Sequence, residues 1–188
     1  MKKFTKILTI LALASQVAFG DTITNIVNYQ TFSSAGAAVL PVSQFNPAYG
    51  TLNSASVSAT LAIDHRSGLE NKSGLAGVLK SMIFATNTIS FGSNINEVSL
   101  TKTNTFQARR FDGVVDYAGT SGTNILSSVS NSFILPADLN SFIGISSVLF
   151  TNQTSAIHQY QGNAASSVLT ETSHTISIQV IYDFTPVE

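Results

Sequence analysis

The chain has 188 residues, of which 44% are hydrophobic and only 10% are charged, and its formal net charge is −1. Charge is far scarcer than in an average globular protein and forms no basic stripe, which argues against binding to nucleic acid or to anionic lipid. Cysteine is absent, so disulfides, thiol nucleophiles and cysteine-ligated zinc are excluded. The many valine, isoleucine and phenylalanine residues indicate a folded chain rather than a disordered one.

The first twenty residues are typical of an export signal. Three lysines precede a short apolar segment, and the small residues Ala18 and Gly20 place the expected cleavage before Asp21. The apolar segment is too short for a stable membrane-spanning helix, and an uncleaved anchor is the alternative. We therefore expect a signal peptide over residues 1–20. The domain is expected over residues 21–188, with 168 residues and a formal charge of −4 after loss of the three lysines.

Strand-like segments follow one another from the start of this domain. Residues 22–32 and 37–42 are predicted as strands, and a turn at Asn46-Pro47 leads into a long alternating run. One side of the run holds Asn53, Ala55, Val57, Ala59, Leu61 and Ile63, and the other holds Ser54, Ser56, Ser58, Thr60 and Asp64. Successive side chains of a strand point to opposite faces, so the run predicts a half-buried strand over 52–63. Residues 64–74 contain three turn-forming residues and much of the charge, and we interpret them as an exposed loop.

The second half of the chain continues in the same way. Residues 75–91 begin with near-helical spacing, but we favour a strand because a helix would be isolated in a β chain. A proline followed by Asp138 predicts one helical turn before Phe142, and Gly162-Asn163 predicts a further turn. Residues 111–117 are either an edge strand or a loop. Further strands are predicted over 98–106, 126–134, 145–151 and 175–184.

About eight to eleven short strands, separated by turns every 8 to 12 residues, predict an all-β fold. We expect a single-domain antiparallel β-sandwich, for which a jelly-roll arrangement is one option. A closed barrel is the alternative.

Few residues are candidates for metal binding or acid–base chemistry. The three histidines are His65, His158 and His174. Glu171 lies three residues before His174, and positions three apart on a strand face opposite ways, so we do not expect the pair to share a metal ion. We interpret all three histidines as surface or turn residues.

The only close acidic pair in a strand-like stretch is Asp112 and Asp116. Two carboxylates held together could act in glycoside hydrolysis, but Arg109 and Arg110 directly precede them, and we interpret the group as a surface charge cluster. The sequence has no Gly-x-Ser-x-Gly elbow, phosphate-binding glycine loop or Asp-rich calcium loop. We therefore expect no enzyme, with no catalytic, cofactor-binding or metal-binding residue and no cofactor.

Aromatic residues could line a sugar-binding face. The candidates are Tyr29, Tyr49, Phe106, Phe111, Tyr117 and Tyr160. Most aromatic residues of a β-sandwich pack in the core, and tryptophan is absent, so core packing is favoured for each of them.

Three segments together resemble a bacterial family. Residues 45–55, Phe-Asn-Pro-Ala-Tyr-Gly-Thr-Leu-Asn-Ser-Ala, are similar to its Phe-Asp-Pro-x-Leu-Gly-Thr-Leu motif. Residues 135–144, Leu-Pro-Ala-Asp-Leu-Asn-Ser-Phe-Ile-Gly, are similar to its Asp-Leu-x-x-Phe-x-Gly segment, and Gly162-Asn163 with residues 176–186 resemble its last part. The chain thus resembles the choice-of-anchor E domain of exported bacterial proteins, over nearly all of the expected mature domain.

This resemblance implies a surface location but no catalytic residue. Members of the family often carry a Pro-Glu-Pro sorting tail, whereas this sequence stops at Glu188 with no apolar span or basic cluster. We therefore expect no transmembrane anchor after signal cleavage.

These patterns lead us to expect a non-enzymatic protein that is secreted or held at the cell surface or outer envelope of a bacterium. Extracellular polysaccharide or other surface proteins are the expected partners, and no nucleic acid is expected. A carbohydrate-binding module is the alternative, because the polar surface is neutral and several tyrosines are present. A hydrolase is the weaker alternative, which requires two or three of the candidate histidines and aspartates within hydrogen-bonding reach in a cleft.

Overall fold

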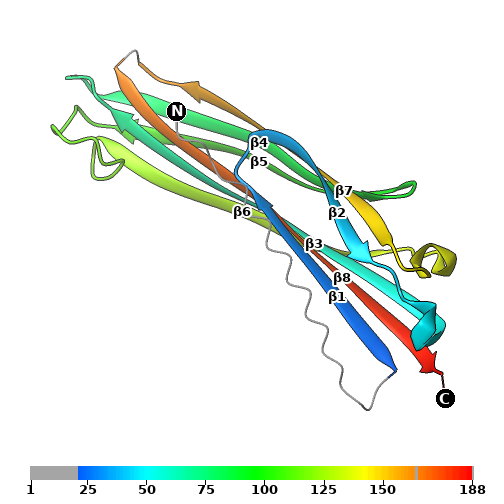
Figure 1. Cartoon of the computed structure of the whole chain (residues 1–188). Coiled ribbons are helices and arrows are strands. Elements are labelled where there is room, and N and C mark those ends of the chain that lie inside the picture. The colour runs from blue at the N-terminus through cyan, green and yellow to red at the C-terminus, as the bar shows by residue number, and fades with distance from the viewer. Residues whose placement is uncertain (1–20, 164, 188) are drawn as a thin grey trace.

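The computed structural model describes residues 21–163 and 165–187, and the expected signal peptide lies outside these residues. The described residues contain eight strands, which form two four-stranded antiparallel sheets that pack face to face (Figure 1). The strands are β1 (Thr22–Thr31), β2 (Ala35–Ser43), β3 (Gly50–Asn71), β4 (Gly77–Phe91), β5 (Asn94–Ala108), β6 (Gly122–Leu135), β7 (Ser147–Gln161) and β8 (Ser166–Pro186). The predicted all-β sandwich is therefore confirmed, and the two sheets do not close into the alternative barrel.

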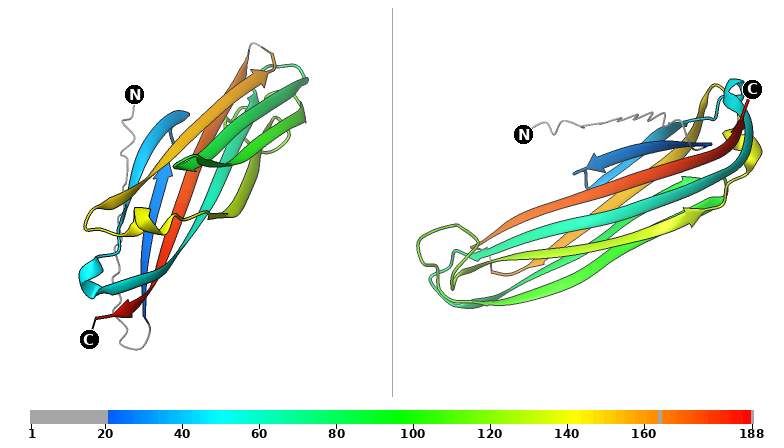
Figure 2. Two further views of the ribbon diagram at one scale, coloured as in Figure 1. Left: turned by 90° about the vertical axis from the view of Figure 1, so that its right-hand side faces the viewer. Right: turned by 90° about the horizontal axis from the view of Figure 1, so that it is seen from below.

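The strand order is that of an eight-stranded jelly roll. Sheet 1 has the order β1-β8-β3-β6, and sheet 2 has the order β2-β7-β4-β5. Every connection except the β4–β5 hairpin crosses from one sheet to the other, which gives the double Greek-key arrangement. The molecule is elongated (Figure 2), because β3 has 22 residues and a strand of that length spans about 70 Å.

Strand β3 continues beyond its predicted end. Val57, Ala59, Leu61 and Ile63 are buried as the alternation predicted. The predicted exposed loop over 64–74 is wrong for residues 64–71, since β3 remains paired with β6 as far as Glu70 and with β8 as far as Asn71. The inward-facing positions of this part of β3 include the polar residues His65 and Ser67, so the hydrophobic alternation that predicts a strand is interrupted there.

The other predicted elements are mostly confirmed. Residues 77–91 form strand β4, as favoured over a helix, and residues 111–117 are a loop rather than an edge strand. The predicted turn before Phe142 is the 3-10 helix η2 (Leu139–Phe142), where the side chain of Asp138 accepts a hydrogen bond from the backbone N–H of Asn140. A second 3-10 helix, η1 (Pro47–Tyr49), follows the predicted Asn46-Pro47 turn.

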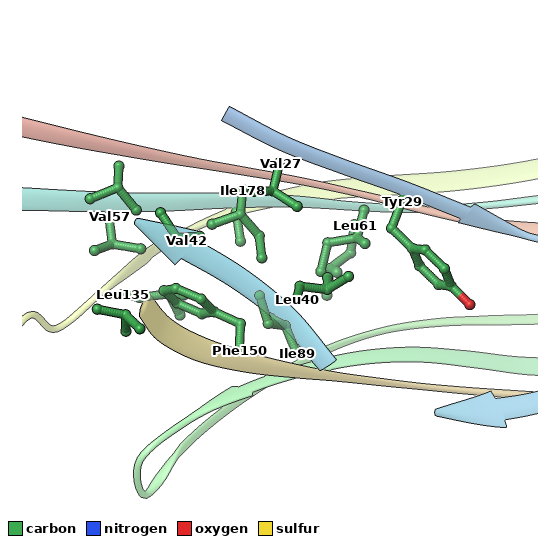
Figure 3. Close-up of a cluster of buried hydrophobic side chains, with 14 of the residues drawn as sticks. Val27, Tyr29, Leu40, Val42, Val57, Leu61, Ile89, Leu135, Phe150 and Ile178 are labelled. Carbon is green, nitrogen blue, oxygen red and sulfur yellow. The ribbon is translucent and has the colours of Figure 1, made fainter. Parts of the chain in front are cut away.

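One half of the interior is apolar. Figure 3 shows Leu61 and Ile178 of sheet 1 facing Phe150 and Ile89 of sheet 2. Aromatic rings fill the end near η1 and η2; these are Phe45, Phe91, Phe142, Phe150, Tyr182 and Phe184. The hydroxyl of buried Tyr182 donates to the carbonyl of Ser43 at 2.7 Å, so this large ring is buried without an unsatisfied polar group.

The other half of the interior contains a band of buried polar side chains. The band separates the main core from a small apolar cluster of Leu69, Leu79 and Ala108. Its members are His65, Ser67, Ser81, Asn87, Asn152, Thr154, Thr172 and His174. We call this group the polar band.

Asn87 joins the two sheets through the polar band. Its side-chain nitrogen, on β4 of sheet 2, donates to the carbonyls of Ala62 at 3.1 Å and Thr175 at 3.0 Å, both in sheet 1. Asn152 donates to the side-chain oxygen of Asn87 at 2.7 Å and to the carbonyl of Thr88 at 2.8 Å. A buried amide whose bonds are all satisfied fixes how the sheets stack, because displacement would leave polar groups unpaired.

Replacing Asn87 with alanine tests this contact. We expect Asn87→Ala to lower the free energy of unfolding by about 1–3 kcal/mol, because it leaves buried polar groups without their partner. Asn28→Ala, at an exposed position on β1, is the matched control and is expected to change stability by less than about 0.5 kcal/mol. Urea denaturation of both variants measures the difference, and equal stabilities would contradict an inter-sheet role for Asn87.

Candidate functional site

The three histidines lie together between the sheets: His65 and His174 belong to the polar band, and the partly buried His158 lies beside it. His65 is on β3, His158 on β7 and His174 on β8, and the rings of His65 and His158 are stacked with centroids 5.1 Å apart. His65 and His174 are only 4% and 1% exposed. The interpretation of the histidines as surface or turn residues is therefore wrong. The arrangement of β3, β7 and β8 brings the three side chains together at inward-facing positions. Because the histidines are far apart in the sequence, the sequence alone does not show this contact.

Thr172 connects two of these histidines. Its hydroxyl oxygen lies 2.9 Å from Nδ1 of His65 and 2.8 Å from Nε2 of His158. A hydroxyl can donate only one proton, so it can donate to one ring nitrogen while it accepts an N–H from the other. Two charged rings with centroids 5.1 Å apart would also repel each other, which favours neutral imidazoles.

The protonation of the histidines follows from their surroundings. Burial lowers the pKa of all three side chains. The pKa of His65 falls to about 4 through burial and, secondly, through His158, while the backbone carbonyl of Glu171 acts in the opposite sense. Nε2 of His174 donates to the carbonyl of Ser155 at 3.3 Å, which leaves its buried Nδ1 with no partner among the described residues. The cluster is thus neutral at pH 7.

No hydrogen bond among the described residues joins an acidic side chain to these histidines. Within residues 21–163 and 165–187, no group of three or more histidine, aspartate or glutamate side chains is placed to hold a metal ion. The neighbours Asp64 and Glu171 are exposed and line the outer face of sheet 1. The prediction that Glu171 and His174 face opposite ways is confirmed.

An open groove lies on the outer face of sheet 1, behind the histidine cluster. It has a volume of about 450 Å³. It is lined by the outward-facing residues Phe32, Asp64, Arg66, Leu126, Ser128, Glu171 and Ser173, and also by His65 and Ser127. Arg66 lies opposite Glu171 of β8 and opposite Leu126 of β6, and its Nε donates to the side chain of Asn124 at 3.1 Å.

Sequence reasoning missed this groove. Arg66 and Glu171 were not singled out as a pair, because they are 105 positions apart in the chain. The only clue in the sequence is the alternation of β3. Arg66 lies an even number of positions from Ser58, Thr60 and Asp64, so it faces outward as they do if β3 continues to residue 66.

The acidic pair lies in the loop of residues 109–121, between β5 and β6. Asp112 accepts a hydrogen bond from the backbone N–H of Val114, and Asp116 accepts one from that of Ala118, both at 3.0 Å. The N–H of Val114 is also the main reason that the pKa of Asp112 is lowered. Both carboxylates shape their own loop, and no hydrogen bond among the described residues joins either to a histidine.

The same loop covers one end of the outer face of sheet 1. Glu70 is fully buried beneath it and accepts a hydrogen bond from the backbone N–H of Tyr117 at 2.9 Å. The Tyr117 ring lies against Gly68, where an added Cβ would be 2.8 Å from the ring, and its hydroxyl lies 3.1 Å from Oγ of Ser167. Tyr117 therefore holds the loop in place.

The remaining aromatic candidates do not share a face. Tyr29 is buried in the main core, and Phe106 packs against the small apolar cluster. Tyr49 and Tyr160 are exposed, but Tyr49 is in η1 beside the start of β3, whereas Tyr160 pairs with Ser81 near the start of β4. They lie at opposite ends of the sandwich.

Comparison with known proteins identifies no family. No family model matches the chain, and no curated protein matches it. Among solved structures, a structure of infectious bursal disease virus (Gx strain) is 14% identical with a TM-score of 0.18, over 87% of this chain and 36% of that one. T=1 particles derived from the virus give 10% identity and a TM-score of 0.25, over 87% and 37%. The chain therefore spans little more than a third of the length of these proteins.

Acidification tests the histidine cluster. The folded-state pKa values of the histidines lie below the unfolded value of about 6.5, so the unfolded chain binds more protons as the pH falls from about 6.5 towards 4. Stability should therefore decrease across this window, by up to about 1.4 kcal/mol per pH unit from His65, and the lowered pKa values of His158 and His174 act in the same direction. Urea denaturation between pH 7.5 and 5 measures the slope.

In the His65→Gln variant, the free energy of unfolding should depend less steeply on pH, because the variant lacks the histidine whose pKa falls to about 4. Arg66→Gln, the next residue on the same strand, is the control and should keep the parent slope. A parent protein whose stability does not change between pH 7 and 5 would contradict the neutral, buried state of the cluster.

Proposed function

We propose that this chain is an exported, non-enzymatic β-sandwich protein of a bacterial cell surface or extracellular matrix. The residue pattern of positions 1–20 and the resemblance to choice-of-anchor E domains support export. Within the described part of the chain, no helix is long and apolar enough to cross a membrane.

The observation that carries the non-enzymatic proposal is the position of the histidines. General acids and bases must reach the substrate within hydrogen-bonding distance. Here His65 and His174 are enclosed between two sheets, while Asp112 and Asp116 are engaged by their own loop.

The outer face of sheet 1 is suited to a hydrated, neutral environment. Its exposed positions are largely hydroxyl residues, which include Ser54, Ser56 and Thr60 on β3 and Ser128, Ser130 and Ser132 on β6. The hydroxyls of Thr60 and Ser132 are 2.8 Å apart across two strands. Such a surface can exchange hydrogen bonds with water and polysaccharide hydroxyls without attracting charged polymers.

The groove favours carbohydrate binding as a second candidate function. Its volume of about 450 Å³ lies within the usual range for small-ligand sites. Arg66 and Glu171 offer a hydrogen-bond donor and an acceptor for sugar hydroxyls. Phe32 and Leu126 offer exposed apolar surface for the C–H face of a sugar ring.

Cell fractionation tests export. We expect the protein in the envelope or culture medium of its bacterial host, with an N-terminus at Asp21 when the purified protein is sequenced. Recovery from the cytoplasm with residues 1–20 still attached would contradict the proposal.

Binding to neutral polysaccharides tests the groove. We expect Arg66→Ala and Glu171→Gln each to weaken binding about tenfold, which corresponds to the loss of roughly one hydrogen bond to a charged group. Glu97→Gln, on the exposed edge strand β5 of sheet 2, is the matched control and should bind as the parent does. Titration calorimetry measures the affinities. Equal binding by the parent and the three variants would show that the sugar does not bind in the groove.

A further inference from the structure

The edge strand β6 differs from the edges of sheet 2. It forms one end of sheet 1 and pairs only with β3. Edge strands usually carry charges, proline or bulges that prevent pairing with another chain. Edge strand β2 contains Pro41, and edge strand β5 contains Glu97 and Lys102. Strand β6, Gly-Thr-Asn-Ile-Leu-Ser-Ser-Val-Ser-Asn-Ser-Phe-Ile-Leu, has no charge, no proline and no break in its register with β3.

The backbone of β6 has hydrogen-bonding groups directed at this open edge. The N–H of Ser132 is bonded to the side-chain oxygen of its neighbour Asn131 at 2.9 Å, not to β3. Successive residues of a strand direct their N–H groups to opposite sides. The even-numbered residues of β6 therefore direct their N–H and C=O groups to the edge, where a further strand could bind all of them except the N–H of Ser132, which Asn131 already engages.

Between Leu126 and Ile134, the outward-facing side chains of β6 read almost the same in both directions. In order they are Leu126, Ser128, Ser130, Ser132 and Ile134, and the exposed Asn124 precedes this symmetric stretch. In an antiparallel pair of two β6 strands centred on Ser130, each serine lies opposite a serine and Leu126 lies opposite Ile134. These two apolar side chains are 77% and 88% exposed in the single chain, and their cross-strand contact would remove apolar surface from water.

We propose that a second copy of this chain binds at β6, through an antiparallel two-fold pairing in which Ser130 lies opposite Ser130. A two-fold axis perpendicular to the sheet joins both copies of sheet 1 into one eight-stranded sheet, with the outer faces on the same side. The other open edge of sheet 1, β1, is also free of charge and proline, but its exposed large apolar residue is the single Ile26, and it lacks the symmetric pattern of β6.

The pairing would also place two grooves side by side. Leu126 and Ser128 belong both to the groove lining and to the β6 edge. A paired molecule would present both grooves on one face, so a long polymer could bind both at once with increased avidity. The pairing itself is independent of what the groove binds.

Light scattering after gel filtration tests the association. For protein purified from full-chain expression, we expect the mass of a dimer. Ser130→Lys places two like charges opposite each other and should give a monomer. Ser99→Lys, an exposed position on edge strand β5, is the matched control and should remain a dimer. A monomeric parent at about 100 µM, or equal dissociation of both variants, would overturn the proposal.

Cysteine cross-linking tests the register, and the absence of native cysteine makes it specific. Across a hydrogen-bonded antiparallel pair the Cα atoms are about 5.5 Å apart, within the range for a disulfide. Ser130→Cys should therefore form covalent dimers under mild oxidation. In Ser128→Cys the two thiol positions are offset by four residues, about 13 Å, and should not cross-link.

The outcomes separate the possible arrangements. Cross-linking of the Ser130→Cys protein alone supports the proposed register. Equal cross-linking of both variants, or open-ended oligomers without a covalent Ser130→Cys dimer, indicates another contact such as β6 against β1 and overturns the proposal. Loss of polysaccharide binding alone would leave these results unchanged.

Discussion

The polar band between the two sheets is the constraint on which the rest of this structure depends. A polar group buried without a hydrogen-bond partner costs about 1–3 kcal/mol, whereas an apolar contact tolerates small displacements. Asn87 reaches the carbonyls of Ala62 and Thr175 in only one stacking position of the sheets. Thr172 imposes a similar condition on His65 and His158. The aromatic end supplies burial, and the polar band determines how the sheets are stacked.

The polar band and the groove use opposite faces of the same strand segments. On β3, His65 faces inward between Asp64 and Arg66, which face the groove. On β8, Thr172 faces inward next to Glu171. Successive side chains of one strand point to opposite faces, so the inward-facing histidines and the outward-facing groove residues share the same backbone. A change in the packing of the histidines would therefore move the strands that hold the groove. The stable arrangement inside the sandwich thus positions the side chains outside it.

Local alternation allowed the fold class and most strands to be predicted. Where inward positions are apolar, as at Leu61 and Ile63 of β3, a period of two is visible in the sequence. Where they are polar, as at His65 and Ser67, the same geometry leaves no hydrophobic signal, and β3 was predicted to end too early. The period itself did not change at this point. Only the type of residue that fills the inward positions changed.

The candidate site could not be predicted because it depends on long-range pairing. His65 and Thr172 are 107 positions apart in the chain, and their contact requires β3 and β8 to be neighbours in register. The order of strands in a jelly roll is set by crossovers between sheets, which no local pattern records. The faces of Glu171 and His174 were predicted correctly, since that relation depends only on strand parity.

Low charge has opposite consequences for the faces and the edges of this molecule. Serine and threonine keep a sheet face hydrated, but unlike lysine they do not prevent another strand from pairing with an edge. The few charges that the chain has must therefore be placed selectively, and on sheet 2 they protect β5 at Glu97 and Lys102. On sheet 1 the edge strand β6 has hydroxyl side chains between two exposed apolar residues. A composition suited to a neutral, hydrated face thus leaves both edges of sheet 1 without charges, and of these two edges only β6 has the symmetric pattern that makes it complementary to itself.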